Sequence, residues 1–347
     1  MRTVKMLFAI FAAVAVVLIG AATFGAVRVH QFLNAPVNVS EQGVDFEIEA
    51  GASFRRVSND LAARGIINKP RSFRAYARWT GSASEVQAGD YRITAGTTAR
   101  ELLEQFTSGA VKLYSFTIIE GWNRWDLLKA LHDNPQLDAS MTDEDWPALL
   151  ETLAADTTHP EGLFLPETYR FPRGTTDRTL LSQAYEHMQV ALAEEWAGRA
   201  QGLPVNSPYE ALVLASIIEK ETARADERAR IAGVFVRRLQ KRMRLQTDPT
   251  VIYGIGSGFD GNLRRSDLRA DTPYNTYTRH GLPPTPIALP GRAAIKAALH
   301  PANGEELYFV ATGLGDGSHR FSTTKQEHDA AVAEYLRQLR KNRSQEI

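Results

Sequence analysis

The sequence of 347 residues contains no cysteine. This absence excludes disulfide bonds, thiolate metal sites, a cysteine nucleophile and a lipidated cysteine. Charge of one sign is not in surplus either, since 40 Lys and Arg residues balance 40 Asp and Glu residues. Nucleic acid is therefore not expected as the main partner, because affinity for phosphate depends largely on an excess of cations.

Metal-binding and phosphate-binding motifs are missing as well. The eight histidines form neither an H-x-x-x-H nor an H-E-x-x-H pattern, so no metal site is expected. His300, His319 and His328 are instead interpreted as structural or substrate-contacting residues. No glycine-rich phosphate loop precedes a helix, and we therefore expect no nucleotide or other cofactor. The composition, with 44% hydrophobic and 23% charged residues, is that of a folded chain of two or three domains.

One long hydrophobic run stands at the N-terminus. Residues 7–27 carry no charge, and at ~1.5 Å per residue they would form a helix about as long as the hydrocarbon core of a bilayer is thick. Arg2 and Lys5 precede the run, so the positive-inside rule keeps residues 1–6 in the cytoplasm and exports the rest. A cleaved signal peptide is the alternative, but its apolar region is typically about 7–15 residues long. We predict an uncleaved transmembrane helix, followed by a linker at residues 28–42.

A repeat follows this linker. Residues 46–53 (FEIEAGAS) match residues 91–98 (YRITAGTT), and a looser third copy begins at Phe116. Each copy alternates apolar and polar residues, turns at a glycine and then offers a helix N-cap, which predicts a strand–turn–helix unit. In the second copy, Thr98 and Glu101 have the spacing of a capping box.

Residues 44–111 resemble a LysM module, which is a strand–helix–helix–strand unit. That resemblance implies binding of glycans that contain N-acetylglucosamine. The alternative is a small α+β domain that reuses one βα unit without binding sugar. We assign the LysM-like module to residues 43–113 and a mixed α+β catalytic domain to residues 114–343, so the expected fold class is α+β.

A helix with unusually complete signals lies in the second of these domains. Residues 207–210 (SPYE) give a capping box with proline at the first helical position, and residues 211–218 are apolar on every face, as in a helix buried in a core. Glu219 ends this run near the helix C-terminus. Burial and the negative end of the helix dipole should both raise its pKa, as a general acid near neutral pH requires. A glutamate paired with a nearby arginine is the alternative, and Glu221 is interpreted as a surface salt bridge.

A polar, proline-rich stretch follows, with little regular structure expected between residues 254 and 290. Loops of this length in a compact domain are usually functional or disordered. Tyrosine faces for sugar rings and amide groups for hydroxyls give this stretch the composition of a carbohydrate groove. A disordered linker is the alternative.

Several motifs resemble, in the same order along the chain, the YceG-like family of endolytic murein transglycosylases. They are EGLFLPETYRF (161–171), LASIIEKET (214–222), RLQTDPTVIY (244–253), YNTY (274–277), GLPP (281–284), HP (300–301) and YFV (308–310). The resemblance spans about residues 40–340, in addition to the anchor. It implies an inner-membrane enzyme whose catalytic domain lies in the periplasm. Such enzymes cleave the β-1,4 bond between N-acetylmuramic acid and N-acetylglucosamine, and the muramic 6-hydroxyl attacks its own anomeric carbon to leave a 1,6-anhydro end.

The resemblance places the catalytic glutamate at Glu219. Because the attacking hydroxyl belongs to the substrate, one carboxyl can act first as acid and then as base, whereas an ordinary hydrolase needs two. Glu167 and Asp248 are candidates for a second acid, although substrate positioning is the preferred role for both. The expected substrate-binding residues are Glu167, Tyr169, Gln246, Thr247, Asp248, Tyr274, Asn275 and Tyr277.

Two other functions remain open on the sequence. A two-carboxylate peptidoglycan hydrolase would leave reducing muramic ends, and a non-catalytic, membrane-tethered glycan-binding protein would not need Glu219. The expected partners are peptidoglycan strands, the cytoplasmic membrane and, by resemblance alone, penicillin-binding proteins of the cell-wall synthesis machinery.

Overall fold

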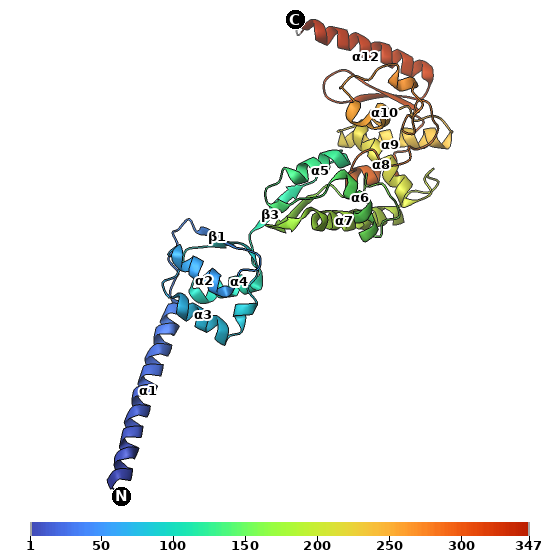
Figure 1. Ribbon diagram of the computed structural model, residues 1–347. Helices are drawn as coiled ribbons and strands as arrows, with labels where there is room; N and C mark the ends of the chain where they lie inside the picture. Colours follow the sequence, from blue (N-terminus) through green and yellow to red (C-terminus); the bar gives the residue numbers. More distant parts are fainter. Residues whose placement is uncertain (1, 346–347) are drawn as a thin grey trace. The chain divides into compact units, whose positions relative to one another are not determined.

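The computed structural model describes residues 2–345, which divide into two compact units (Figure 1). Unit 1 comprises the described residues up to Tyr114 together with Pro172–Gly174. Unit 2 comprises Ser115–Phe171 and the described residues from Thr175 onward. Both units contain helices and strands, which confirms the mixed α+β class.

The N-terminal helix α1 is continuous from Arg2 to Asn34. Its segment Phe11–Asn34 is long and apolar enough to cross a membrane, judged by length and composition. The linker expected at residues 28–42 is wrong over its first part, because the helix does not end there. Phe32 and Leu33 near the end of α1 are buried in the core of unit 1, so that core begins while the chain is still helical.

Unit 1 is built around a two-stranded antiparallel sheet. Its elements after α1 are β1 (Val44–Ile48), α2 (Phe54–Ala63), α3 (Pro70–Trp79), η1 (Ser82–Ser84), β2 (Gly89–Ile93) and α4 (Ala99–Ser108). Phe46 of β1 lies opposite Tyr91 of β2, and both rings pack on Phe106 of α4 at centroid distances of 5.9 and 4.7 Å. The strand–turn–helix prediction is therefore confirmed as β1–α2 and β2–α4. The capping box of Thr98 and Glu101 is formed in both directions.

The third copy of the repeat leads into unit 2. The elements of this part are β3 (Leu113–Thr117), α5 (Arg124–His132), β4 (Leu137–Asp138), η2 (Asp143–Asp145), α6 (Trp146–Thr152), β5 (Thr168–Pro172), β6 (Thr175–Thr176) and α7 (Asp177–Ala197). Strand β3 pairs with β5, and β4 pairs with β6 in parallel. Asn123 caps α5 through a capping box with Asp126, so the strand–turn–helix pattern holds here too.

The core of unit 2 surrounds α8 (Pro208–Glu221). Around and after it come α9 (Ala225–Gln240), α10 (Asp248–Ile255), η3 (Gly256–Gly258), η4 (Asp267–Arg269), α11 (Arg292–Leu299), β7 (Tyr308–Ala311), β8 (His319–Ser322) and α12 (Lys325–Gln345). Helices α7, α9 and α11 pack against α8, which is why its residues 211–218 are apolar on every side. The side chain of Ser207 accepts a hydrogen bond from the Glu210 amide as predicted, but the Glu210 carboxylate accepts from Asn206 instead of completing the capping box.

Candidate functional site

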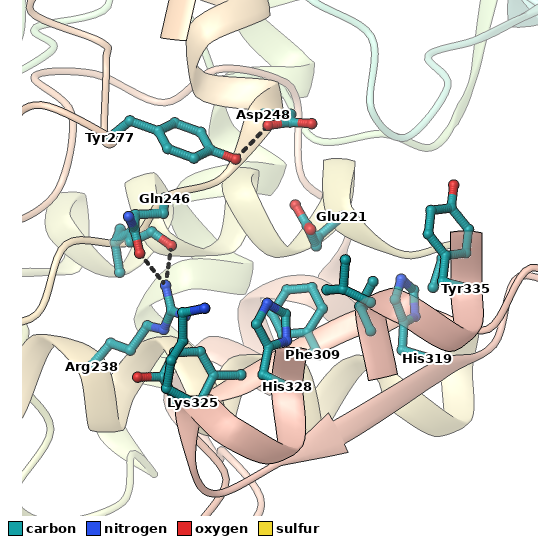
Figure 2. Close-up of a pocket in the computed structure, with 15 residues that line it drawn as sticks. Glu221, Arg238, Gln246, Asp248, Tyr277, Phe309, His319, Lys325, His328 and Tyr335 are labelled. Atoms are coloured by element: carbon teal, nitrogen blue, oxygen red, sulfur yellow. Dashed lines mark hydrogen bonds between the residues drawn. The ribbon is translucent and has the colours of Figure 1, made fainter. Parts of the chain in front are cut away.

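A cavity of about 480 Å³ opens at the C-terminal end of α8 in unit 2 (Figure 2). This volume lies within the range of about 300–1,000 Å³ that is usual for ligand pockets. Its lining comes from α8, α9, α10, the loops beside them, the β7–β8 hairpin and α12. The lining residues are Glu221, Arg238, Leu245, Gln246, Asp248, Tyr277, Tyr308, Phe309, Val310, Ala311, His319, Lys325, His328, Val332 and Tyr335.

Glu221, the last residue of α8, presents its carboxyl to this cavity. Figure 2 shows it between the Tyr277–Asp248 pair and the side chains of the hairpin and α12. Its Oε2 accepts a hydrogen bond of 2.7 Å from the Thr247 hydroxyl. Burial raises the pKa of Glu221, and the negative charge of Asp248 raises it further, against the opposing effect of the Thr247 bond. The expected surface salt bridge is therefore wrong, because the carboxyl faces the cavity.

Asp248 and Tyr277 form a hydrogen-bonded pair beside Glu221. The Tyr277 hydroxyl donates to Asp248 Oδ1 at 2.6 Å (Figure 2). Burial and the Asp248 carboxylate raise the pKa of Tyr277, so the phenol stays neutral and keeps its proton to donate. Asp248 itself is exposed at the start of α10. The pair thus offers the cavity one aromatic face and one carboxylate, and both residues are among those predicted to bind substrate.

The loop that carries Gln246 is held in an unusual backbone conformation. Gln246 has a φ of +52°, a left-handed value that non-glycine residues rarely adopt. The buried Arg238 holds the loop by donating to the Leu245 carbonyl at 2.8 Å, and its guanidinium also reaches the Gln246 side chain at 3.5 Å. On the other side, the Thr247 amide donates to the Thr276 hydroxyl at 3.1 Å. Backbone strain of this kind is often retained where it orients functional groups.

The opposite wall was only partly indicated by the sequence. His319 Nδ1 lies 2.8 Å from Glu227 Oε2, and the Glu227 carboxylate also accepts from the His319 amide. His328 of α12 stacks on Tyr308 of β7 with a centroid distance of 5.2 Å. The sequence predicts that both histidines are structural or substrate-contacting, whereas nothing in it singles out Lys325, which also lines the cavity. Only the folded hairpin brings these residues to a helix end about a hundred positions earlier in the chain.

Glu219 lies on another face of α8, because two residues turn a helix by about 200°. Its Oε2 accepts a hydrogen bond of 2.9 Å from the Gly291 amide, and its Oε1 lies 3.8 Å from Arg228. The side chain is only 6% exposed and does not line the cavity. Burial raises the pKa of Glu219, and the nearby Glu120 adds to this effect.

Two predicted binding residues are buried and serve the fold. The Tyr169 ring is 2% exposed in the core of unit 2, and its hydroxyl donates to the Leu165 carbonyl at 2.7 Å. Asn275 is 1% exposed, and its amide group donates to the carbonyls of Asp267 and Ala270. Their polar groups hold the surrounding chain, and the binding of substrate by these two side chains stays a prediction.

Two further predicted residues lie outside the cavity lining. Glu167 bonds to His187 at 2.9 Å and lies 3.5 Å from Arg292. The Tyr274 hydroxyl is 2.8 Å from the Thr285 hydroxyl. The structure therefore brings Gln246, Asp248 and Tyr277 together at the cavity and Thr247 directly behind it.

Another buried carboxyl in unit 2, that of Glu161, was not predicted. Glu161 is fully buried, and its Oε2 accepts from the Arg124 amide and the Tyr253 hydroxyl at 3.2 and 2.9 Å. Burial raises the pKa of Glu161 to about 7. Its other oxygen, Oε1, is buried without a hydrogen-bond partner. A protonated carboxyl suits this position better than a carboxylate, because an uncompensated buried charge is costly.

The architecture and the motifs around the cavity define a class. The chain belongs to the YceG-like family, whose sequence profile matches residues 46–334. It is 33% identical over 314 residues to the endolytic murein transglycosylase of Bacillus subtilis (strain 168), with 86% of each chain covered. It is 28% identical over 331 residues to the endolytic murein transglycosylase of Streptococcus pneumoniae serotype 2, and this match covers 86% of the present chain and 59% of the relative.

A solved structure shares the fold. The crystal structure of a yceG-like protein from Listeria monocytogenes matches with a TM-score of 0.50 and 28% sequence identity. The match covers 84% of the present chain and 99% of that chain.

Proposed function

We propose that this chain is an endolytic lytic transglycosylase of peptidoglycan. It cleaves the β-1,4 bond between N-acetylmuramic acid and N-acetylglucosamine in nascent strands, leaves 1,6-anhydro ends and so terminates strand elongation. The activity for which its relatives are named supports this function. The structural observation that carries it is the Glu221 carboxyl, which has a raised pKa and faces a cavity with an aromatic face and hydrogen-bonding groups.

In this proposal Glu221 acts as acid and then as base. Its carboxyl proton passes to the glycosidic oxygen, and the bond from that oxygen to the anomeric carbon breaks. The muramic 6-hydroxyl oxygen bonds to the anomeric carbon, and the Glu221 carboxylate takes the hydroxyl proton. Glu221 ends the reaction protonated and no water is consumed. The reaction needs no second carboxylate, because the nucleophile is held within the substrate.

The neighbours of Glu221 are assigned to substrate positioning. The Tyr277 ring suits a sugar face, and Asp248 and the Gln246 amide suit sugar hydroxyls. Thr247 acts behind them through its bond to Glu221. Because the negative charge of Asp248 raises the pKa of Glu221, we assign Asp248 to substrate positioning and not to the role of a second acid.

Glu219 is the second candidate for the acid, since its pKa is raised as well. Replacing each glutamate by glutamine separates the two, because the amide keeps the shape but cannot transfer the proton. General acid–base catalysis contributes roughly 10²–10⁴-fold. We expect Glu221→Gln to lose at least about that factor in release of anhydro-muropeptides, measured by mass spectrometry of digested peptidoglycan, and Glu219→Gln to retain most of the activity.

The same experiment decides between the enzyme classes. A loss confined to Glu219→Gln would make Glu219 the acid. Reducing muramic ends from the unmodified protein would indicate a hydrolase, and cleavage unaffected by either substitution would exclude both assignments.

The remaining assignments concern the membrane and unit 1. Residues 7–27 are proposed to span the inner membrane once, with residues 1–6 in the cytoplasm and the catalytic domain, residues 114–343, in the periplasm. Residues 43–113 are proposed to bind glycan as a LysM-like module, and the order β1–α2–α3–β2 with antiparallel strands supports this. Penicillin-binding proteins are proposed partners.

A further inference from the structure

Helix α1 enters unit 1 without a flexible segment. The apolar run ends at Val27, and Phe32 is already buried in the core of unit 1. Five residues of helix rise only about 7.5 Å. The headgroup layer on each side of a bilayer is roughly 5–8 Å thick. If α1 spans the membrane as proposed above, the part of unit 1 next to Phe32 lies at the level of the lipid headgroups.

Helix α3 lies at this part of unit 1. The ring of Phe73 in α3 is 6.4 Å from the ring of Phe32 in α1. Figure 1 shows α3 on the side of unit 1 from which α1 leaves and β1 on the opposite side. Helix α3 therefore combines contact with the end of α1 and a place on the side of unit 1 from which α1 leaves.

The solvent side of α3 is a narrow stripe with an unusual composition. Arg71, Ala75, Arg78 and Trp79 are all exposed, and their spacing places them on one face of the helix, opposite the buried Phe73. We call these four residues the α3 face. Trp79 is 83% exposed, although tryptophan usually buries most of its surface.

The segment that carries this face has charge of one sign. Residues 64–80 contain five arginine and lysine residues and no acid, and residues 1–40 contain no acid either. A basic segment that contains no acid and carries an exposed tryptophan is the combination expected at an anionic lipid surface, because indole rings prefer the headgroup level and cations are attracted to acidic lipids.

A cavity of about 420 Å³ lies beside the same exit of α1. Phe32 and Ile66 give it apolar surface, whereas Gln31, Asn68 and Lys69 give it an amide and ammonium lining. Groups of this kind can bind the phosphate of a phospholipid headgroup while apolar side chains contact its glycerol region. The cavity is therefore a second feature at headgroup height whose chemistry matches lipid.

We infer that the α3 face rests on the surface of the membrane that α1 crosses, on the side where unit 1 lies, and holds unit 1 against acidic phospholipid headgroups. The inference rests on the membrane anchoring proposed above and adds a second contact to it. Each cation near an acidic lipid surface strengthens association by about fivefold. Arg71 and Arg78, with Trp79 inserted between headgroups, therefore make a persistent contact once α1 has brought them close.

The absence of cysteine makes a direct test simple, because one introduced cysteine can be labelled alone. The full chain carrying Ala75→Cys is labelled with a polarity-sensitive fluorophore and reconstituted in vesicles of phosphatidylcholine, with or without about 30% phosphatidylglycerol. At this fraction several acidic lipids adjoin each cation. We expect blue-shifted emission and quenching by a lipid-borne quencher in the acidic vesicles. Adding Arg71→Gln, Arg78→Gln and Trp79→Ser should reduce that quenching severalfold.

Two matched labels make each outcome decisive. Glu47→Cys on β1, on the opposite side of unit 1, should remain in water, and Val16→Cys in α1 should lie in lipid. If the label at 75 is as water-exposed as the label at 47 while the label at 16 lies in lipid, the inference fails and the anchor stands. A label at position 16 that lies in water would overturn both this inference and the proposed membrane anchor. The substituted residues are exposed, and an unchanged unfolding temperature confirms that the variants are folded.

Discussion

Glu219 and Glu221 are two residues apart on α8, and this spacing decides which carboxyl reaches the cavity. Both lie at the end of α8, and burial raises the pKa of both. Glu221 reaches a cavity, whereas Glu219 is held by the Gly291 amide and lies near Arg228. The sequence could place an acid at this helix end, but α8 is apolar on every face, so no periodicity indicates which direction faces the substrate.

The charge of Asp248 gives the first prediction at this scale. Asp248 raises the pKa of Glu221, so Asp248→Asn should lower that pKa. Because the acid must be protonated, the fall of kcat/KM at high pH should then occur at lower pH than in the unmodified enzyme. The measurement is a pH–rate profile on peptidoglycan fragments. Asp271→Asn, which removes an exposed carboxylate bound to Arg279, is the control and should leave the profile in place. If the fall of kcat/KM at high pH stays in place in Asp248→Asn, the effect of Asp248 on the pKa of Glu221 is contradicted.

Glu161 gives a prediction of stability. Its pKa is about 7 in the folded protein, above the ordinary glutamate value of about 4.5. The contribution of the protonated Glu161 carboxyl to the free energy of unfolding is therefore complete below pH ~4.5 and is lost as pH rises through ~7. Its magnitude is on the order of 3 kcal/mol. Urea unfolding at pH 5 and pH 8 should show this loss in the unmodified chain. Glu161→Gln, which stays neutral, should remove most of the difference in stability between the two pH values. An equal difference in both proteins would contradict the assignment of this pH dependence to Glu161.

At the scale of elements, local signals predicted starts of helices and turns well. The capping box at Thr98, the repeated strand–turn–helix unit and the cap at Ser207 all follow from a few adjacent residues, and all are present. The cavity wall from the β7–β8 hairpin and α12 could not be predicted, because it meets α8 only through tertiary packing. The burial of Tyr169 could not be predicted for the same reason, since aromatic residues of a binding groove and of a core look alike in sequence.

The N-cap of α8 offers a test at this scale. Ser207→Ala removes the acceptor for the Glu210 amide and should cost about 1 kcal/mol in the free energy of unfolding. Ser207→Asp keeps an acceptor at the same position and should stay within a few tenths of a kcal/mol of the unmodified protein. Chemical denaturation of all three proteins provides the comparison. Equal losses in both variants would mean that the serine is needed for packing and not for capping.

At the scale of the whole molecule, composition and hydrophobic pattern predicted a membrane helix and a mixed α+β exported part. The α+β class is confirmed, and α1 is long and apolar enough to cross a membrane. The linker expected at residues 28–42 was wrong over its first part, because α1 continues to Asn34 and Phe32 and Leu33 pack into a core. A short apolar pair that follows a membrane span does not indicate by its sequence whether its side chains will be buried in the next domain.

The proposed orientation can be tested with the complete chain. Alkaline phosphatase fused after Ile347 should be active, because it folds only after export, whereas a cytoplasmic reporter at the same position should be silent. Removing residues 2–27 from the same fusion should abolish phosphatase activity. The reverse pattern, with activity only from the cytoplasmic reporter, would place the catalytic domain inside the cell.

The stiffness of α1 also limits where an anchored enzyme can search. If α1 crosses the membrane as proposed, no slack separates it from the buried Phe32, and unit 1 then turns and drifts with its anchor and keeps one elevation above the bilayer. Encounters with glycan then become two-dimensional, and strands that have already moved away into the wall are met less often than strands still emerging from the membrane. One extra turn of helix after Val27 would raise that elevation by about 5.4 Å, so the length of α1 sets how far from the bilayer unit 1 meets glycan.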